Sequence, residues 1–180
     1  MKDEWTLSHL SRRRFLKLSA TWTGGFWLVG IPVTLTADYK VLTREESEIM
    51  DALADCIIPP GEFAGGKEAG LTHFIDQQID DDGYLRRDRE LYKTCLPALE
   101  QSSVERYGER FLRMGHTQQT DYLKRIEGGE YDDSSAAKAW LPFKPSHFFG
   151  KMRDHCMMGF YGSPEHGGNK NFVSYRMIRF

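Results

Sequence analysis

Cysteine is scarce in this sequence of 180 residues, and none of its three cysteines lies in a Cys-x-x-Cys pair or a Cys-x-x-Cys-His run. The ligand patterns typical of iron–sulfur clusters and covalently attached haem are therefore missing. The Gly-Gly pairs never extend to Gly-x-Gly-x-x-Gly, and neither Gly-x-Ser-x-Gly nor His-Glu-x-x-His occurs. The sequence thus predicts no catalytic, cofactor-binding or metal-binding residues in this chain.

A strong excess of charge of one sign is also absent, since the formal net charge is −2. Residues 1–37 hold five Lys/Arg and two Asp/Glu, so the remainder keeps 19 basic and 24 acidic side chains and a net charge of −5. The basic residues of this remainder are interspersed with acidic ones. Such a chain lacks the basic patch that nucleic acid or an anionic membrane surface would require.

No run of alternating β-branched residues is long enough for a sheet, and helical spacing of apolar residues is found instead. Thr43 and Glu46 form a capping-box pattern at the start of a helix that ends before Pro59-Pro60. A second helix is expected over residues 71–79. Helical spacing continues over residues 85–114, where Pro97 predicts a kink or break.

Two further helices are predicted, one over residues 116–127 with Thr117 as its N-cap and one beginning near Ser146. The second should bury one apolar face, made of Phe148, Phe149, Met152, Cys156 and Met157. The expected fold class is all-α. We expect a single small helical domain over residues 38–180, with an extended, irregular, aromatic C-terminal tail.

Long apolar runs are limited to the N-terminus, where residues 18–37 follow a basic segment. This arrangement is typical of a twin-arginine export signal, which here would span residues 1–37. The residues expected to carry the signal are Ser11, Arg12, Arg13, Phe15, Leu16 and Lys17. The run is diluted by Thr, Gly and Pro but would just cross a bilayer, so a leader retained as an anchor is the alternative.

One acidic segment invites comparison with a calcium-binding loop, because Asp80, Asp82 and Gly83 match its third, fifth and sixth positions. However, Gln78 holds the first position and Arg89 the twelfth, where a bidentate glutamate is needed. An acidic helix end followed by a glycine turn explains the segment better. The six histidines likewise show no metal-ligand spacing.

The C-terminal third combines aromatic residues with Arg153, Arg176 and Arg179, the composition of a protein-binding hot spot. The chain has three cysteines, so they cannot all pair with one another in an oxidising compartment. One cysteine should therefore stay free or pair with another chain, and Cys156 is the predicted inter-chain partner.

The stretch from Phe148 to Ile178 resembles the closing signature of the gluconate 2-dehydrogenase subunit 3 family. That signature has a Phe-Phe pair, then Gly-Phe-Tyr, a Pro, Gly-Gly-Asn and a late aromatic residue. The matching positions are Phe148, Phe149, Gly159, Phe160, Tyr161, Pro164, Gly167, Gly168, Asn169 and Tyr175. Tyr175 departs from the family, which commonly has Trp there.

The resemblance implies a small subunit without a cofactor of its own, in a membrane-associated dehydrogenase. Its partners would be an FAD-containing large subunit that oxidises a sugar or sugar acid and a multihaem c-type cytochrome. The twin-arginine signal would then also export the folded, FAD-loaded subunit to the periplasm, at the outer face of the inner membrane. The residues expected to bind the partner are Phe149, Arg153, Cys156, Phe160, Tyr161, Pro164, Gly167, Gly168, Asn169, Tyr175 and Arg176.

An independent exported helical enzyme or ligand-binding protein, with a cofactor site of unfamiliar pattern, is the alternative hypothesis. The two differ in what the chain does by itself. A subunit would show no oxidoreductase activity alone, whereas an independent enzyme would carry bound flavin, haem or metal.

Overall fold

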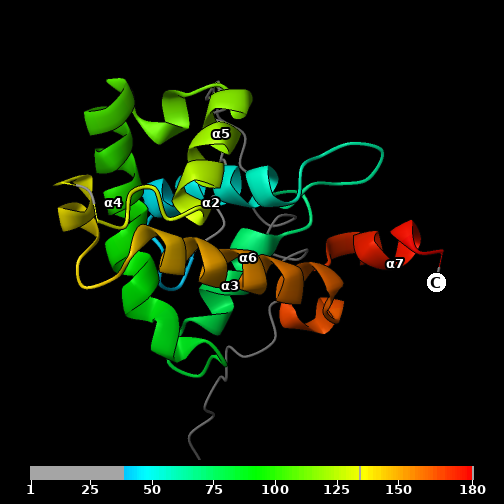
Figure 1. Ribbon diagram of the computed structural model, residues 1–180. Coiled ribbons are helices and arrows are strands. Elements are labelled where there is room, and N and C mark those ends of the chain that lie inside the picture. Colours follow the sequence, from blue (N-terminus) through cyan, green and yellow to red (C-terminus); the bar gives the residue numbers. More distant parts are fainter. Residues whose placement is uncertain (1–38, 134, 180) are drawn as a thin grey trace, which may run out of the picture. The chain divides into compact units, whose positions relative to one another are not determined.

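The computed structural model describes residues 39–133 and 135–179, and these residues contain helices and no β-strand (Figure 1). The expected all-α fold is therefore confirmed for this part of the chain. The predicted export signal, including Arg12 and Arg13, lies outside the described residues. The α-helices are α2 (Arg44–Ile57), α3 (Leu71–Gln78), α4 (Arg89–Tyr107), α5 (His116–Glu127), α6 (Pro145–Tyr161) and α7 (Val173–Met177).

Helix α2 begins with the predicted capping box. The Glu46 amide donates to Thr43 Oγ1 at 3.2 Å, and the Thr43 amide donates to Glu46 Oε2 at 2.7 Å. Lys93 on α4 also donates to Glu46 Oε2, at 2.6 Å. The carboxylate that caps α2 therefore also ties α2 to α4.

The helical stretch predicted over residues 85–114 is divided into three pieces. A short 3-10 helix, η1 (Arg86–Asp88), precedes α4, and another, η2 (Phe111–Arg113), follows it. Pro97 does not break the helix, because α4 runs through it from Arg89 to Tyr107. The helix instead ends at Gly108, which has φ 71° and so adopts a left-handed conformation that favours glycine.

The predicted N-caps of the next two helices are wrong. Helix α5 starts at His116, with Gly115 as its N-cap, so Thr117 lies inside the first turn. Helix α6 starts at Pro145, a residue favoured at a first helical position because it has no amide proton to satisfy. Ser146 instead donates its backbone amide to Asp132 Oδ1 at 2.9 Å, and its hydroxyl also donates to that carboxylate.

Helix α6 lies at the centre of the fold and packs against α3, α4 and α5 (Figure 1). Its buried face includes Phe148, Phe149, Met152 and Cys156, as predicted. Met157, which was expected on the same face, is 43 % exposed. The Phe148 ring lies between Trp140, from the 3-10 helix η3 (Ser135–Trp140), and Tyr92 of α4, at centroid distances of 5.7 and 6.1 Å.

The segment that enters the domain is held by a buried carboxylate. Asp76 on α3 is 1 % exposed and accepts hydrogen bonds from three successive backbone amides. Lys40 donates at 2.7 Å, Val41 at 3.0 Å and Leu42 at 2.9 Å. A carboxylate with this many amide donors is well satisfied despite its burial. The chain is therefore fixed to α3 from residue 40 onward.

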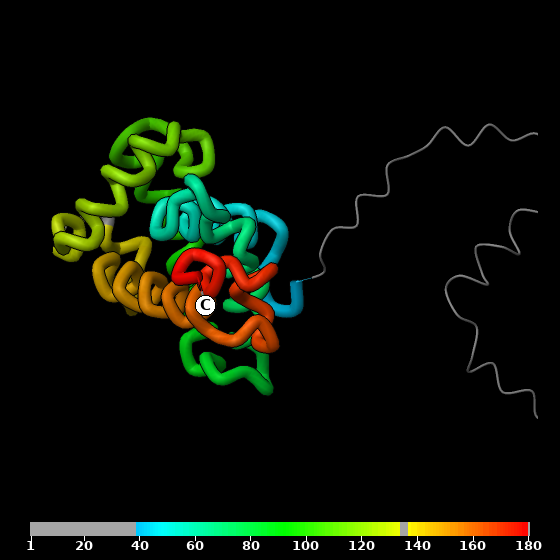
Figure 2. Tube along the Cα trace, turned by 90° about the vertical axis from the view of Figure 1, so that its right-hand side faces the viewer, coloured from blue at the N-terminus to red at the C-terminus, as the bar shows by residue number. Residues whose placement is uncertain are grey.

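The C-terminal segment is folded into short helices, so the prediction of an extended tail is wrong. After α6 come the 3-10 helices η4 (Pro164–His166) and η5 (Lys170–Phe172), and then α7. Left-handed residues separate these pieces, with φ of 93° at Gly167 and 45° at Asn169. Figure 2 faces this segment, coloured orange to red, where it turns back beside the end of α6.

Candidate functional site

The last turns of α6 lie very close to α3, and Gly159 makes this approach possible. A Cβ atom at position 159 would lie 2.6 Å from Phe74 Cδ1 and 3.0 Å from Leu71 Cδ2. Carbon atoms do not approach as closely as 2.6 Å, so a larger residue at position 159 would have to displace the Phe74 ring. The glycine of the Gly-Phe-Tyr motif therefore serves helix packing.

The Gly-Gly pair at 167–168 brings the chain back across the same place. A Cβ at position 168 would lie 2.4 Å from the Gly159 carbonyl oxygen, so the two backbones are in direct contact. Gly167 has φ 93°, and a Cβ there would lie 2.6 Å from Gln77 Oε1 on α3. Just beyond, the Lys170 amide donates to the Ala69 carbonyl oxygen at 3.0 Å. The returning chain is thus in close contact with α6 and α3 and is hydrogen-bonded to the turn just before α3.

Asn169 completes this connection as a fully buried side chain. Its Nδ2 donates to the carbonyl oxygen of Gly162 at 2.9 Å, and its Oδ1 accepts from the Ser174 amide at 2.9 Å. Asparagine also tolerates the left-handed backbone found here better than most residues. One side chain therefore joins the end of α6 to the start of α7.

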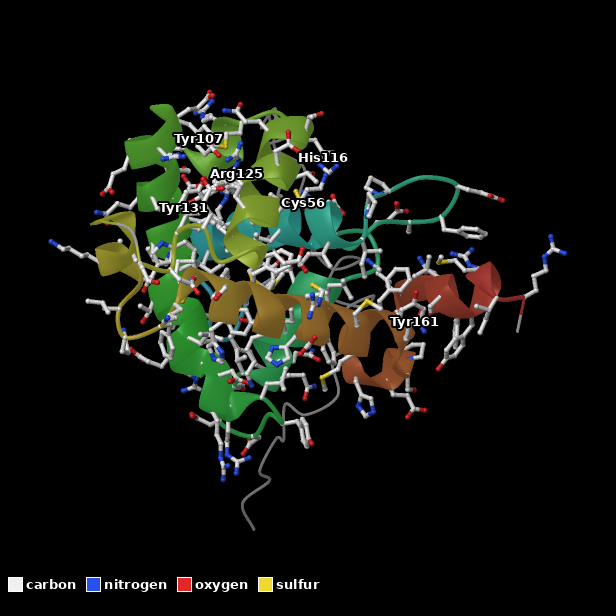
Figure 3. The ribbon with its side chains drawn as sticks, viewed as in Figure 1. Cys56, Tyr107, His116, Arg125, Tyr131 and Tyr161 are labelled. Carbon is white, nitrogen blue, oxygen red and sulfur yellow. The ribbon has the colours of Figure 1, made fainter. Side chains whose placement is uncertain are left out.

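The predicted partner-binding residues fall into three groups by their exposure. The buried ones are Phe149, Cys156, Phe160, Gly168 and Asn169. Those exposed to solvent are Arg153, Tyr161 and Arg176, whereas Pro164, Gly167 and Tyr175 are half-buried. Neighbours can differ completely, since Phe160 is buried but Tyr161, labelled in Figure 3, is half exposed.

Burial of Cys156 argues against the inter-chain disulfide predicted for it. The side chain has no exposed surface, and burial raises the pKa of its thiol, so the reactive thiolate is disfavoured. Cys95 is buried as well, and burial raises its pKa to about 12. Cys56 is the cysteine with partial exposure, and its Sγ lies 3.8 Å from His116 Nδ1 (Figure 3). Burial raises the Cys56 pKa too.

Arg153 is exposed but already has partners in this chain. Its Nη1 lies 2.8 Å from Glu127 Oε1 on α5, and its Nε lies 3.7 Å from Asp154 Oδ1. Arg176 differs, because it forms no ion pair with any residue that the structure describes. It lines a hollow of about 410 Å³ together with Pro60, Gly61, Glu62, Phe63, Ala64 and Glu68.

Exposed apolar side chains gather in the same C-terminal region. Among the described residues, six of the nine large apolar side chains that remain exposed lie between positions 157 and 178. We call these six the C-terminal surface: Met157, Met158, Tyr161, Phe172, Met177 and Ile178. Sequence reasoning found only Tyr161 of these as a site residue, because methionine and isoleucine on a helix are usually core residues. Exposed apolar residues gathered in one region are typical of protein-binding surfaces.

A group of polar side chains also lies inside the fold, between α4 and α6. His155 is buried, its Nδ1 lies 2.7 Å from the Tyr92 hydroxyl, and its Nε2 lies 3.5 Å from Asp88 Oδ2. Burial lowers the pKa of His155, against the opposing effect of Asp88. The neutral imidazole is therefore favoured, and its two contacts join α6 to α4 and to the end of η1.

No three His, Cys, Asp or Glu side chains in residues 39–133 and 135–179 are grouped so as to hold a metal ion. None of the helices in those ranges combines the length and apolar character needed to cross a bilayer.

Neither a curated protein nor a solved structure matches this sequence. A family model does match, described as "Gluconate 2-dehydrogenase subunit 3", over residues 44–180. The match begins at the first residue of α2 and includes the Gly159, Gly167-Gly168 and Asn169 positions whose packing is described above. It covers well over half of the chain. The chain therefore belongs to the gluconate 2-dehydrogenase subunit 3 family.

Proposed function

We propose that this chain is a non-catalytic small subunit of a periplasmic, flavin-dependent dehydrogenase, which binds the FAD-containing large subunit through the C-terminal surface. The family is that of a subunit of a multi-subunit dehydrogenase, so protein partners are implied. A multihaem c-type cytochrome would be a further subunit. FAD and haem c would then belong to the partners, and the complex would lie at the outer face of the inner membrane.

The observation that carries the proposal is the concentration of exposed apolar side chains on a firmly held segment. Gly159, Gly168 and Asn169 fix the C-terminal segment to α3 and α6. The exposed side chains therefore stand on an ordered support and lose little conformational freedom on binding. The neighbouring hollow beside Arg176 offers a concave site for a side chain of the partner.

The binding experiment uses the full chain coexpressed with the proposed FAD-containing subunit. Changing Phe172 and Ile178 together to Ser removes two side chains that are 56 % and 65 % exposed. We expect retention of the flavin subunit to fall by at least tenfold, as for truncation of hot-spot residues. Leu141→Ser is the matched control, because Leu141 is 67 % exposed but lies far along the chain from this surface.

Equal retention by the double variant and the control would contradict the proposed binding surface. Thermal unfolding of each variant checks that the fold is intact, since exposed side chains contribute little to the core.

Export is tested separately from binding. The twin-arginine signal at Ser11–Lys17 is proposed to carry the flavin subunit, already folded around FAD, across the membrane with this chain. Changing both Arg12 and Arg13 to Lys should leave the flavin subunit in the cytoplasm. Normal amounts of periplasmic flavin subunit with this variant would disprove shared export.

A further inference from the structure

The buried polar group between α4 and α6 places a base directly against a phenol. His155 Nδ1 lies 2.7 Å from the Tyr92 hydroxyl, and His155 Nε2 lies 3.5 Å from Asp88 Oδ2. A carboxylate only accepts, so we assign the imidazole proton to Nε2, on the side of Asp88. A neutral imidazole then has its acceptor at Nδ1, and the Tyr92 hydroxyl donates to it. We call these two residues the Tyr92–His155 pair.

Burial keeps both members of the Tyr92–His155 pair uncharged. Tyr92 has no exposed surface, and His155 is 3 % exposed. Burial raises the pKa of Tyr92 well above its ordinary value and lowers the pKa of His155. Near neutral pH the proton therefore stays on the phenol, while the imidazole remains able to accept one. The other titratable groups that face the pair are Asp88, Lys151, Asp154, Cys95 and Cys156.

Such a pair favours oxidation of the tyrosine by one electron. Removal of an electron from a phenol makes its hydroxyl proton strongly acidic, so oxidation is easiest where a base is in place to take that proton. His155 Nδ1 lies within the distance at which a proton is transferred directly. Asp88, which also pairs with Lys151 at 3.3 Å, stabilises the imidazolium that results.

The hydrogen bond of Tyr122, another buried tyrosine, leads to a hydroxyl group instead. Tyr122 is 1 % exposed, and its hydroxyl lies 2.6 Å from Ser102 Oγ. The Ser102 hydroxyl donates to the Ala98 carbonyl oxygen at 2.8 Å, so its oxygen accepts from Tyr122. A serine hydroxyl is too weak a base to take up a proton near neutral pH. Tyr92 and Tyr122 are therefore equally buried but differ in the group that receives their hydrogen bond.

We propose that Tyr92 is a redox-active side chain, whose phenolic proton moves to His155 Nδ1 as a one-electron oxidant takes an electron from its ring. The oxidant belongs to the class of oxidised metal complexes or peroxide-derived radicals. The O–H bond breaks and an N–H bond forms, which leaves a neutral tyrosyl radical, an imidazolium and an oxidant reduced by one electron. Because the ring is buried, dissolved reductants do not reach the radical, and the core stores one oxidising equivalent. The inference concerns this chain alone and goes beyond the proposed function.

The experiment uses the purified full chain. Light and persulfate convert ruthenium tris-bipyridine to its ruthenium(III) form, a one-electron oxidant, and electron paramagnetic resonance follows the tyrosyl radical. One variant is Tyr92→Phe, and Tyr122→Phe is the matched control. A third variant, His155→Gln, keeps Tyr92 but replaces the base by an amide that does not take up its proton. Thermal unfolding confirms that each variant is folded.

We expect Tyr92→Phe to remove the long-lived tyrosyl signal and Tyr122→Phe to leave it unchanged. Exposed tyrosines such as Tyr84 give radicals that dissolved reductants quench quickly. His155→Gln should slow formation of the long-lived signal by about tenfold or more, because a positioned base is lost. Equal signals from the wild type and Tyr92→Phe would overturn the proposal, and so would an equal loss in both Tyr→Phe variants. An unchanged rate in His155→Gln would overturn proton transfer to His155.

The pH dependence of the wild type tests the same step without any substitution. A protonated imidazole has no acceptor at Nδ1, so formation of the long-lived signal should slow as pH drops below about 6.5. Proton release from Tyr122 toward Ser102 would show no such dependence. A rate that stays constant as pH falls from about 8 to about 5 would overturn the proposal.

Discussion

Two glycines of α6 allow a test of the packing argument by the same substitution at two positions. Gly159 approaches α3 so closely that a Cβ would lie 2.6 Å from the Phe74 ring. Gly150, in the same helix, has no atom within 4 Å of where its Cβ would be. Replacing glycine by alanine inside a helix stabilises it by about 0.5–1 kcal/mol when there is room. Gly150→Ala should therefore stabilise the protein.

Gly159→Ala gains the same helix propensity but must displace Phe74. Overpacking of this kind costs about 1–3 kcal/mol, so the net effect should be a loss of about 0–2 kcal/mol. A change of 1 kcal/mol shifts the melting temperature of a domain of this size by about 2–4 °C. We expect Gly150→Ala to raise the melting temperature measured by circular dichroism, and Gly159→Ala to lower it. Equal increases for both variants would refute the close approach of α6 and α3.

Three further predictions concern single side chains. Asn169→Ala should lower the free energy of unfolding, measured in urea, by about 2–4 kcal/mol more than Asn171→Ala does. Both residues have positive φ, but only Asn169 makes the two buried hydrogen bonds. Similar losses would contradict this role. In the folded chain, a thiol reagent should modify Cys56 slowly and spare Cys156 until the protein unfolds; early labelling of Cys156 would show that the core opens. Burial lowers the pKa of His155 in the folded chain, so as pH falls this histidine is protonated in the unfolded chain before it is protonated in the folded one. The free energy of unfolding should therefore fall as pH drops below about 6.5. His155→Gln should flatten this dependence between pH 7 and 5, and an unchanged slope would exclude His155 as its source.

Much of the helical framework could be predicted from local sequence. The Thr43–Glu46 capping box and the apolar spacing that follows specify α2, and both depend only on residues close in the chain. The start of α6 was harder to predict from the sequence. Ser146 is a good N-cap residue in general, but here Asp132, fourteen positions earlier, takes its hydrogen bonds. Such a competitor is visible only in three dimensions.

The candidate site was predictable as a region but not residue by residue. The Gly-Phe-Tyr and Gly-Gly-Asn motifs led to the C-terminal third, yet Phe160 and Asn169 are used to build its support. Sequence alone cannot separate a side chain that packs within the chain from one that would pack against another chain. Met177 and Ile178 were missed for the same reason, since the type of an apolar residue does not show whether it is exposed or buried.

The carboxylate of Asp76 also determines how the domain would respond to a force applied at its N-terminal side. If the proposed export signal draws the domain through a translocase, tension would reach residue 40, where three hydrogen bonds from backbone amides to the Asp76 carboxylate would resist it. Since Asp76 belongs to α3, that helix would then bear part of the tension. The domain could then cross the membrane folded, without unfolding from its N-terminal side.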